Sequence, residues 1–188
     1  MDEVTAVCRR LLGDGEAAAR CAGAGDPDAG REQRLAAALA CCRSATAGAD
    51  HVDSVQGDGL RSAVAGELRA AIAEVPERQR EAMALRDVAG LSHAELAAVL
   101  GLEPAAALAL LIRARLSLRG ALRGEALGSD SCPEHERALR TITLRIDHEP
   151  VPEADDDWLV EHVGHCDGCR QAHATLLEAA ACYRGWPS

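Results

Sequence analysis

The chain has 188 residues, of which 30 are acidic and 20 are basic. All 20 basic residues are arginine, and the formal net charge is −10. So acidic a chain is a poor general coat for nucleic acid, since such binding depends on neutralising phosphates. Its apolar runs are far shorter than the roughly 20 residues that cross a bilayer, which excludes a membrane-spanning role. The acidic amino terminus lacks the basic and apolar regions of a signal peptide, so we expect a cytoplasmic protein.

Small, polar, glycine-containing stretches at 46–61 and 125–131 predict two linkers. They separate three units, at 1–45, 62–124 and 132–188. Apolar residues follow helical spacing in each unit, which predicts an all-α fold.

Charge is distributed unevenly along the chain. Residues 1–75 hold 12 acidic residues and 8 arginines, residues 76–124 hold 5 and 7, and residues 125–188 hold 13 and 5. Only the middle of the chain is therefore positive, and it is the part in which phosphate contacts are most plausible.

Two stretches of the first unit have a recognisable pattern. From Val7 to Ala17, an apolar and basic helix is followed by Gly13-Asp14 and a second, acidic helix, and Leu35–Arg43 follows as a later helix. These stretches resemble a shortened region 2 of sigma-70-family factors. The resemblance implies contact with RNA polymerase, but Leu35–Arg43 has none of the aromatic residues that hold unpaired promoter DNA in that family.

Eight cysteines in a cytoplasmic protein indicate metal binding or buried thiols before disulfides. Cysteine behaves as a small apolar side chain when buried. We therefore predict buried thiols for the four cysteines of the first unit, which are Cys8, Cys21, Cys41 and Cys42.

The middle unit begins with two helices. Leu68, Ile72 and Val75 lie on one helical face that ends before Pro76, and Arg80–Val88 predicts a second helix, closed by Gly90.

A helix-turn-helix follows. Ser92 is a good N-cap and forms a capping box with Glu95, which opens a helix over His93–Leu100. Its inward residues are expected to be Ala94, Leu96, Ala97 and Leu100. Gly101 ends this helix, and Pro104 suits the first turn of the next, which extends to Arg119 or beyond.

The residues from Val75 to Glu81, from Leu85 to Ala97 and from Leu100 to Leu102 closely resemble region 4 of sigma-70-family factors, especially the extracytoplasmic-function group. Arg113-Ala114-Arg115 continues the resemblance. It implies a helix-turn-helix domain that binds the −35 promoter element and a flap of RNA polymerase.

The second helix of this motif departs from the family, because Ala106–Ile112 is apolar where the family carries polar and basic residues. Base edges are read by hydrogen-bonding side chains, which Leu108, Leu110 and Ile112 do not provide. We predict that these three dock a protein partner or another domain. The candidate DNA contacts are the basic residues further along the helix, namely Arg113, Arg115, Arg119 and Arg123.

The last unit carries a metal-ligand pattern. His162, Cys166 and Cys169 form a His-x3-Cys-x2-Cys motif, and Cys132 lies 30 residues before His162. Three thiolates and one imidazole are a common structural set for Zn²⁺. His135 is an alternative to Cys132 as the fourth ligand.

Three nearby residues are not expected to be ligands. They are His165, His173 and Cys182.

The same unit resembles the zinc-binding anti-sigma domain, in which an upstream Cys or His and an "LDGEL-P" turn precede the His-Cys-Cys motif. The turn corresponds to Ile146–Pro152 here, and Arg170 follows Cys169 as in the family pattern. The resemblance implies a small helical bundle that wraps a sigma factor and blocks its polymerase contacts.

An enzyme is not expected, because the sequence offers no glycine-rich phosphate loop, no nucleophile paired with a base, no open metal position and hence no small-molecule substrate. The first hypothesis is a sigma-factor-like transcription regulator, acting on RNA polymerase and promoter DNA, with a fused zinc anti-sigma-like domain. The alternative is a pseudo-sigma interaction module that has lost DNA binding and binds another sigma factor, a polymerase subunit or another regulator.

Overall fold

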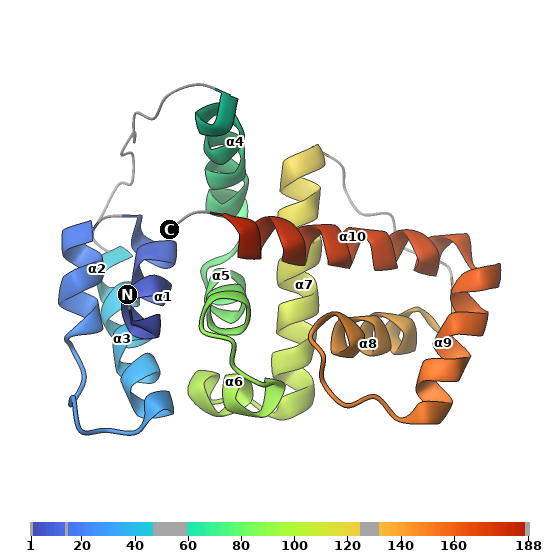
Figure 1. Ribbon diagram of the computed structural model, residues 1–188, viewed down its shortest axis with the longest axis horizontal. Helices are drawn as coiled ribbons and strands as arrows, with labels where there is room; N and C mark the ends of the chain where they lie inside the picture. The colour runs from blue at the N-terminus through green and yellow to red at the C-terminus, as the bar shows by residue number, and fades with distance from the viewer. Residues whose placement is uncertain (1, 14, 47–59, 125–131, 187–188) are drawn as a thin grey trace.

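The computed structural model describes residues 2–13, 15–46, 60–124 and 132–186, and every regular element in these ranges is a helix (Figure 1). The predicted all-α fold is therefore confirmed. The predicted linkers at 46–61 and 125–131 lie almost entirely outside the described residues.

The first three helices form a group at one end of the molecule (Figure 1). They are α1 (Glu3–Leu12), α2 (Gly15–Ala22) and α3 (Arg31–Thr46). Asp2 caps α1, because its carboxylate accepts a hydrogen bond from the Val4 N–H at 2.9 Å.

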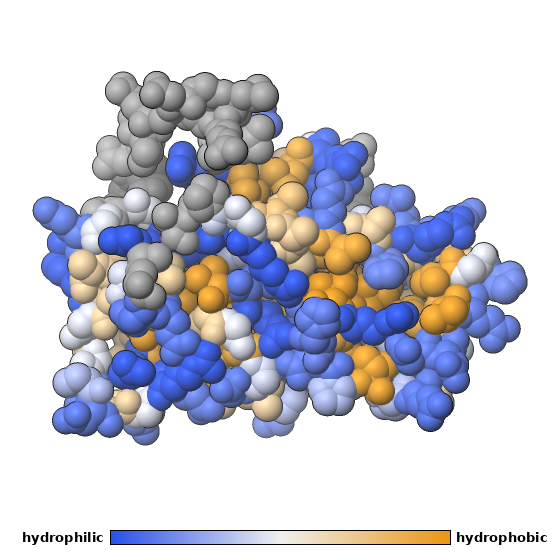
Figure 2. All heavy atoms as spheres, in the orientation of Figure 1, coloured by the Kyte–Doolittle hydropathy of each residue, from blue (hydrophilic) through white to orange (hydrophobic). Residues whose placement is uncertain are grey.

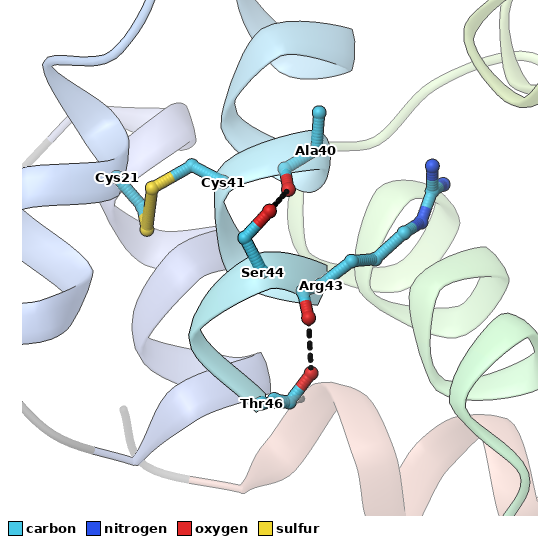
Figure 3. Close-up of a disulfide and its surroundings, with 6 residues drawn as sticks. All are labelled: Cys21, Ala40, Cys41, Arg43, Ser44 and Thr46. Atoms are coloured by element: carbon cyan, nitrogen blue, oxygen red, sulfur yellow. Dashed lines mark hydrogen bonds between the residues drawn. A yellow bond between two sulfur atoms is a disulfide. The ribbon is translucent and has the colours of Figure 1, made fainter. Parts of the chain in front are cut away.

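The cysteines of this group divide into a disulfide and a thiol pair. Cys21 and Cys41 form a disulfide between α2 and α3, with their Cα atoms 5.2 Å apart (Figure 3). Cys8 and Cys42 are buried free thiols, and the hydrogen bond to Cys8 together with burial raises the pKa of Cys42. The prediction of buried thiols is confirmed for Cys8 and Cys42 and is wrong for the other two, because the packing of α2 on α3 brings together cysteines 20 residues apart.

Four helices and one π-helical turn form the centre of the molecule: α4 (Leu60–Glu74), α5 (Glu77–Met83), η1 (Ala84–Val88), α6 (His93–Leu100) and α7 (Pro104–Arg123). The predicted break at Pro76 separates α4 from α5. Helices α6 and α7 meet at 97° across the short turn that follows Gly101, where φ is +64°. This is the predicted helix-turn-helix.

The start of α6 follows the prediction, and one of its inward residues does not. The capping box between Ser92 and Glu95 is present. Ala94 is exposed, whereas the His93 side chain is buried, because His93 turns inward to contact a carboxylate of the last unit, Asp147.

The last three helices are α8 (His135–Ile146), α9 (Glu153–His165) and α10 (Asp167–Gly185). Helix α10 crosses α7 and runs from α9 back toward the amino-terminal helices (Figure 1). The face in Figure 2 carries hydrophobic patches along the path of α10 among mostly hydrophilic side chains.

Buried apolar side chains form two clusters. The larger one joins α1, α2 and α3 to the central helices and includes Ala179 and Tyr183 of α10. The smaller one packs Leu108 and Ile112 of α7 against α8, α9 and α10. The predicted units at 1–45 and 62–124 therefore share one core.

The end of α10 is anchored on α1 through Arg10. Its guanidinium donates hydrogen bonds to the carbonyl oxygens of Tyr183, at 2.6 Å, and Trp186, at 2.7 Å. It also lies over both aromatic rings, 5.0 and 4.7 Å from their centroids.

Among the described residues, no single helix is long and apolar enough to cross a membrane. Helices α6 and α7 reach that composition only as a pair, and the pair is bent.

A left-handed residue, His148, follows the end of α8. The Glu149 N–H donates to the Leu144 carbonyl at 2.9 Å and the His148 N–H donates to the Arg145 carbonyl at 3.1 Å, which is a Schellman motif. His148 has a φ of +55° and is the only non-glycine residue with a positive φ among those described. The motif turns Asp147 and Glu149 toward α6.

We expect glycine in place of His148 to stabilise the chain by about 0.5–1 kcal/mol, because glycine adopts the left-handed region without the Cβ penalty, less its larger entropy loss on folding. Denaturant unfolding of both chains measures the difference. Ala174→Gly, at an exposed position in the interior of α10, is the control and is expected to lose about 1 kcal/mol. A destabilised His148→Gly chain would contradict the expectation.

Candidate metal centre and the interface around α7

Four predicted ligands meet where the last three helices converge. Cys132 precedes α8, His162 lies on α9, Cys166 joins α9 to α10, and Cys169 lies in the first turn of α10. Their ligand atoms all lie within 4.8 Å of one another, and Cys132 Sγ is 3.5 Å from His162 Nε2.

The donor set fits a tetrahedral metal ion. Zn–S distances of about 2.3 Å place neighbouring ligand sulfurs ~3.8 Å apart in a tetrahedron, so a small contraction of the cluster would close it around an ion. Burial and hydrogen bonds to Cys166 and Cys132 raise the pKa of Cys169. The cluster could therefore bind a metal ion, and three sulfur donors favour a soft or borderline cation.

Aromatic packing orients the histidine of this cluster. Trp158 stacks on the His162 ring, with centroids 4.7 Å apart and an interplanar angle of 17°. The Arg137 guanidinium lies over the Trp158 ring, 4.0 Å from its centroid, and pairs with Asp155 at 2.6 Å. This stack restricts the rotation of the imidazole before any ion is bound.

The neighbouring histidines lie outside the group of four. His135 Nδ1 is 3.6 Å from Cys169 Sγ, close enough to hydrogen-bond to that sulfur. His165 is exposed and its Nδ1 is 2.9 Å from the Glu161 carbonyl oxygen in its own helix.

The apolar face of α7 is covered by the last unit. Leu108 and Ile112 are buried, 7% and 5% exposed, against residues that include Ile142 and Leu176. Leu110 is half-buried and packs against the larger core instead. Two of the three residues expected to dock a partner or another domain therefore contact another part of the same chain.

The four arginines proposed as DNA contacts have different surroundings. Arg113 is exposed. Arg119 and Arg123 both pair with Glu178 of α10, at 2.8 and 3.0 Å. Arg115 is fully buried and pairs with Asp147 and Asp87. In this arrangement three of the four face carboxylates.

Asp147 is the centre of a buried ion cluster between the last unit and the helix-turn-helix. Its carboxylate accepts two hydrogen bonds from Arg115, at 2.7 and 3.0 Å, and one from Arg184 at 2.7 Å. His93 Nε2 lies 2.9 Å from its second oxygen. Burial raises the pKa of Asp147, but the hydrogen bonds from His93 and Arg115, together with the positive charges of Arg115 and Arg86, outweigh burial and hold its pKa below the usual range.

The pKa of the second carboxylate of this cluster, on Asp87, is shifted in the opposite direction. Asp87 lies in η1 and pairs with Arg115 at 2.9 Å and with Arg184 at 2.8 Å. Burial and the negative charge of Asp147 together raise the pKa of Asp87 by more than these two arginines lower it.

The sequence did not predict this ion cluster. Asp147 lies in the turn matched to the anti-sigma pattern, which is the one local signal for it. Its partner Arg115 is 32 residues away, and Asp87 is 97 residues from Arg184. Pairings over such distances leave no periodic pattern.

Comparison with known protein families gives one result. Residues 65–118 match the model of the family described as "Sigma-70, region 4", and the matched range includes the helix-turn-helix of α6 and α7. This is a family of transcription regulators that typically contacts RNA polymerase and promoter DNA. Searches of curated proteins and of solved structures gave no significant match.

Proposed function

We propose that this protein, whose residues 65–118 match the sigma-70 region 4 family, is a cytoplasmic sigma-factor-like transcription regulator acting on RNA polymerase and promoter DNA, and that its last unit is a zinc anti-sigma-like module that restrains region 4. The single observation that carries the proposal is the interface on α7. The module packs on Leu108 and Ile112 and supplies Glu178 to Arg119 and Arg123.

The restraint works through both apolar contact and charge. Carboxylates of the module neutralise the basic end of α7, which lowers its attraction for phosphates. Packing on Leu108 and Ile112 also places α8 and α10 against the helix that would enter a DNA groove. The acidic last unit therefore competes with DNA for the same helix.

Zn²⁺ would be held by Cys132, His162, Cys166 and Cys169. A closed Cys3His site supplies structural cohesion rather than an open coordination position. It would tie α8, α9 and α10 together, and these helices have few large apolar residues of their own to pack.

The alternative is a pseudo-sigma interaction module that does not bind DNA and binds another sigma factor or a polymerase subunit. One observation favours it. The exposed residues near the start of α7 are Pro104, Ala105 and Ala106, so this part of the helix has no donor for a base edge.

One experiment tests the proposal in the intact chain. Helix α10 contributes Ala179 and Tyr183 to the larger core, so deleting the last unit would damage more than the interface. Glu178→Gln removes only the carboxylate that pairs with Arg119 and Arg123. Glu161→Gln, at an exposed position on α9, removes the same charge from a side chain that pairs with neither arginine and is the matched control.

We expect Glu178→Gln to bind duplex DNA about 3–10-fold more tightly than Glu161→Gln at low salt, because Glu178 no longer neutralises the charges of buried Arg119 and exposed Arg123, which then attract phosphates more strongly. Gel shift measures DNA binding, and a pull-down with RNA polymerase measures the second partner. Polymerase binding without DNA binding in any chain would favour the alternative. The proposal would be contradicted if neither DNA nor RNA polymerase bound to the wild type, Glu178→Gln or Glu161→Gln.

A further inference from the structure

The turn that follows α8 places a second acidic side chain, Glu149, against the start of α6, the first helix of the helix-turn-helix. Glu149 Oε1 accepts a hydrogen bond from the His93 backbone N–H at 3.1 Å and another from Arg86 at 3.0 Å. Arg86 also donates to the Asp147 backbone carbonyl. Glu149 therefore occupies a position where a helix start and an arginine converge.

These donors have the chemistry of an oxyanion site. His93 is the first residue of α6, so its N–H has no acceptor within the helix and lies at the positive end of the helix dipole. The Arg86 side chain is only 10% exposed, which strengthens its interaction with an anion. Backbone N–H groups at a helix start together with an arginine are a recurring arrangement for phosphate.

A second observation marks the same place as a polar site. The His93 side chain is only 10% exposed, and its Nδ1 is buried with no hydrogen-bond partner among the described residues. Its Nε2 is already engaged by Asp147. The ring thus keeps polar capacity beside the helix start that Glu149 covers.

We propose that Arg86 and the start of α6 form a binding site for a phosphate of the DNA backbone, and that Glu149 occupies it as a substitute for that phosphate. The proposal deepens the proposed function, on which it rests, by naming the contact through which the last unit competes with DNA. Helix α6 is the first helix of the helix-turn-helix, and in this motif the first helix crosses the DNA backbone.

Glu149 is the exchangeable member of the turn and Asp147 is the fixed one. The Asp147 side chain is 0% exposed and is held by Arg115 and Arg184. The Glu149 side chain is 17% exposed and pairs with Arg86 alone among the described basic side chains. An incoming phosphate can therefore replace Glu149 while the ion cluster around Asp147 remains.

The test uses the full metal-loaded chain and the isosteric change Glu149→Gln. The probe is a fluorescein-labelled DNA duplex of random sequence, and Glu161→Gln is again the charge-matched control. We expect Glu149→Gln to bind the duplex about five-fold more tightly than the control, and log K to fall with log salt concentration with a slope steeper by about one phosphate contact.

Arg86→Gln separates the site from a general change of charge. In the Glu149→Gln background it is expected to abolish the gain, whereas alone it should leave duplex binding nearly unchanged, because Glu149 already occupies Arg86. A folded Glu149→Gln chain that binds like Glu161→Gln, or a gain that survives Arg86→Gln, would overturn the proposal.

Titration with inorganic phosphate distinguishes the two sources of the anion. Saturable binding of phosphate by Glu149→Gln without any gain for the duplex would overturn the assignment to DNA. The same experiments distinguish a failure of the anion site from a failure of the proposed function. A gain in Glu149→Gln with no polymerase binding and no effect of Glu178→Gln supports the anion site and removes the proposed function, while the reverse pattern removes only the anion site.

Discussion

A chain in which asparagine replaces Asp147 is expected to lose about 3 kcal/mol of its free energy of unfolding. The substitution keeps the size of the side chain but removes one of two carboxylates that face the fully buried Arg115. A buried guanidinium without sufficient counter-charge is strongly destabilising. Denaturant unfolding followed by circular dichroism measures the loss, and Asp157→Asn, at an exposed position on α9, is the control.

A double variant shows whether the loss arises from this pair. Replacing Arg115 and Asp147 together by methionine and leucine is expected to cost less than the sum of the single changes, because no unpaired buried charge remains from the pair. An Asp147→Asn chain within 0.5 kcal/mol of the Asp157→Asn control, on the order of ordinary surface substitutions, would contradict the central role given to Asp147.

The pH dependence has a definite sign. The pKa of Asp147 is lower in the folded chain than the ordinary value of 3.8. A group of this kind stabilises the fold above its unfolded pKa and loses that contribution as the pH falls through its folded pKa. The stability difference between wild type and Asp147→Asn is therefore expected to shrink below about pH 4.

Removal of the zinc ion that we propose for the Cys3His cluster is the second change with a large expected effect. Structural zinc sites bind with apparent free energies of roughly 10–16 kcal/mol, much of which is folding free energy. If only about 5 kcal/mol is coupled to folding here, chelation should lower Tm by about 10–20 °C. Thermal unfolding of the zinc-loaded chain with and without chelator measures the shift, and atomic absorption measures the metal content.

Two cysteine variants sharpen this test. Cys166→Ser removes a ligand and is expected to hold no zinc and to melt at the same temperature with or without chelator. Cys182→Ser changes a cysteine of α10 outside the cluster and should keep one zinc per chain. Equal metal content in the two variants would contradict the assigned site. A Cys132→Ser chain that retains zinc would mean that His135 supplies the fourth ligand.

Local features were predictable from the sequence. The capping box of Ser92 and Glu95, the helix end at Gly101 and the helix start at Pro104 depend on residues a few positions apart, and each lies where it was predicted. The four proposed metal ligands also meet, because three of them lie within eight residues and the spacing itself carries the geometry.

Features set by tertiary packing were not predictable. Arg115 and Arg119 were predicted as candidate DNA contacts, because no residue near them in the sequence indicates their pairing with Asp147 and Glu178. Cys21 gives no local signal of its pairing with Cys41. His93 and Ala94 exchange their expected burial because a carboxylate from another unit lies against the start of α6.

The contact between Arg10 and the end of α10 joins residues 173 and 176 positions apart. Such a contact closes a loop almost as long as the described chain, and a high contact order slows folding because loop-closure entropy is lost before the contact forms. The amino-terminal helices are synthesised first, but their docking on Tyr183 and Trp186 has to wait for the last helix. Between these two events the nascent chain exposes the surface of α1 that α10 later covers, which makes this stage of biogenesis the one most open to chaperone binding or aggregation.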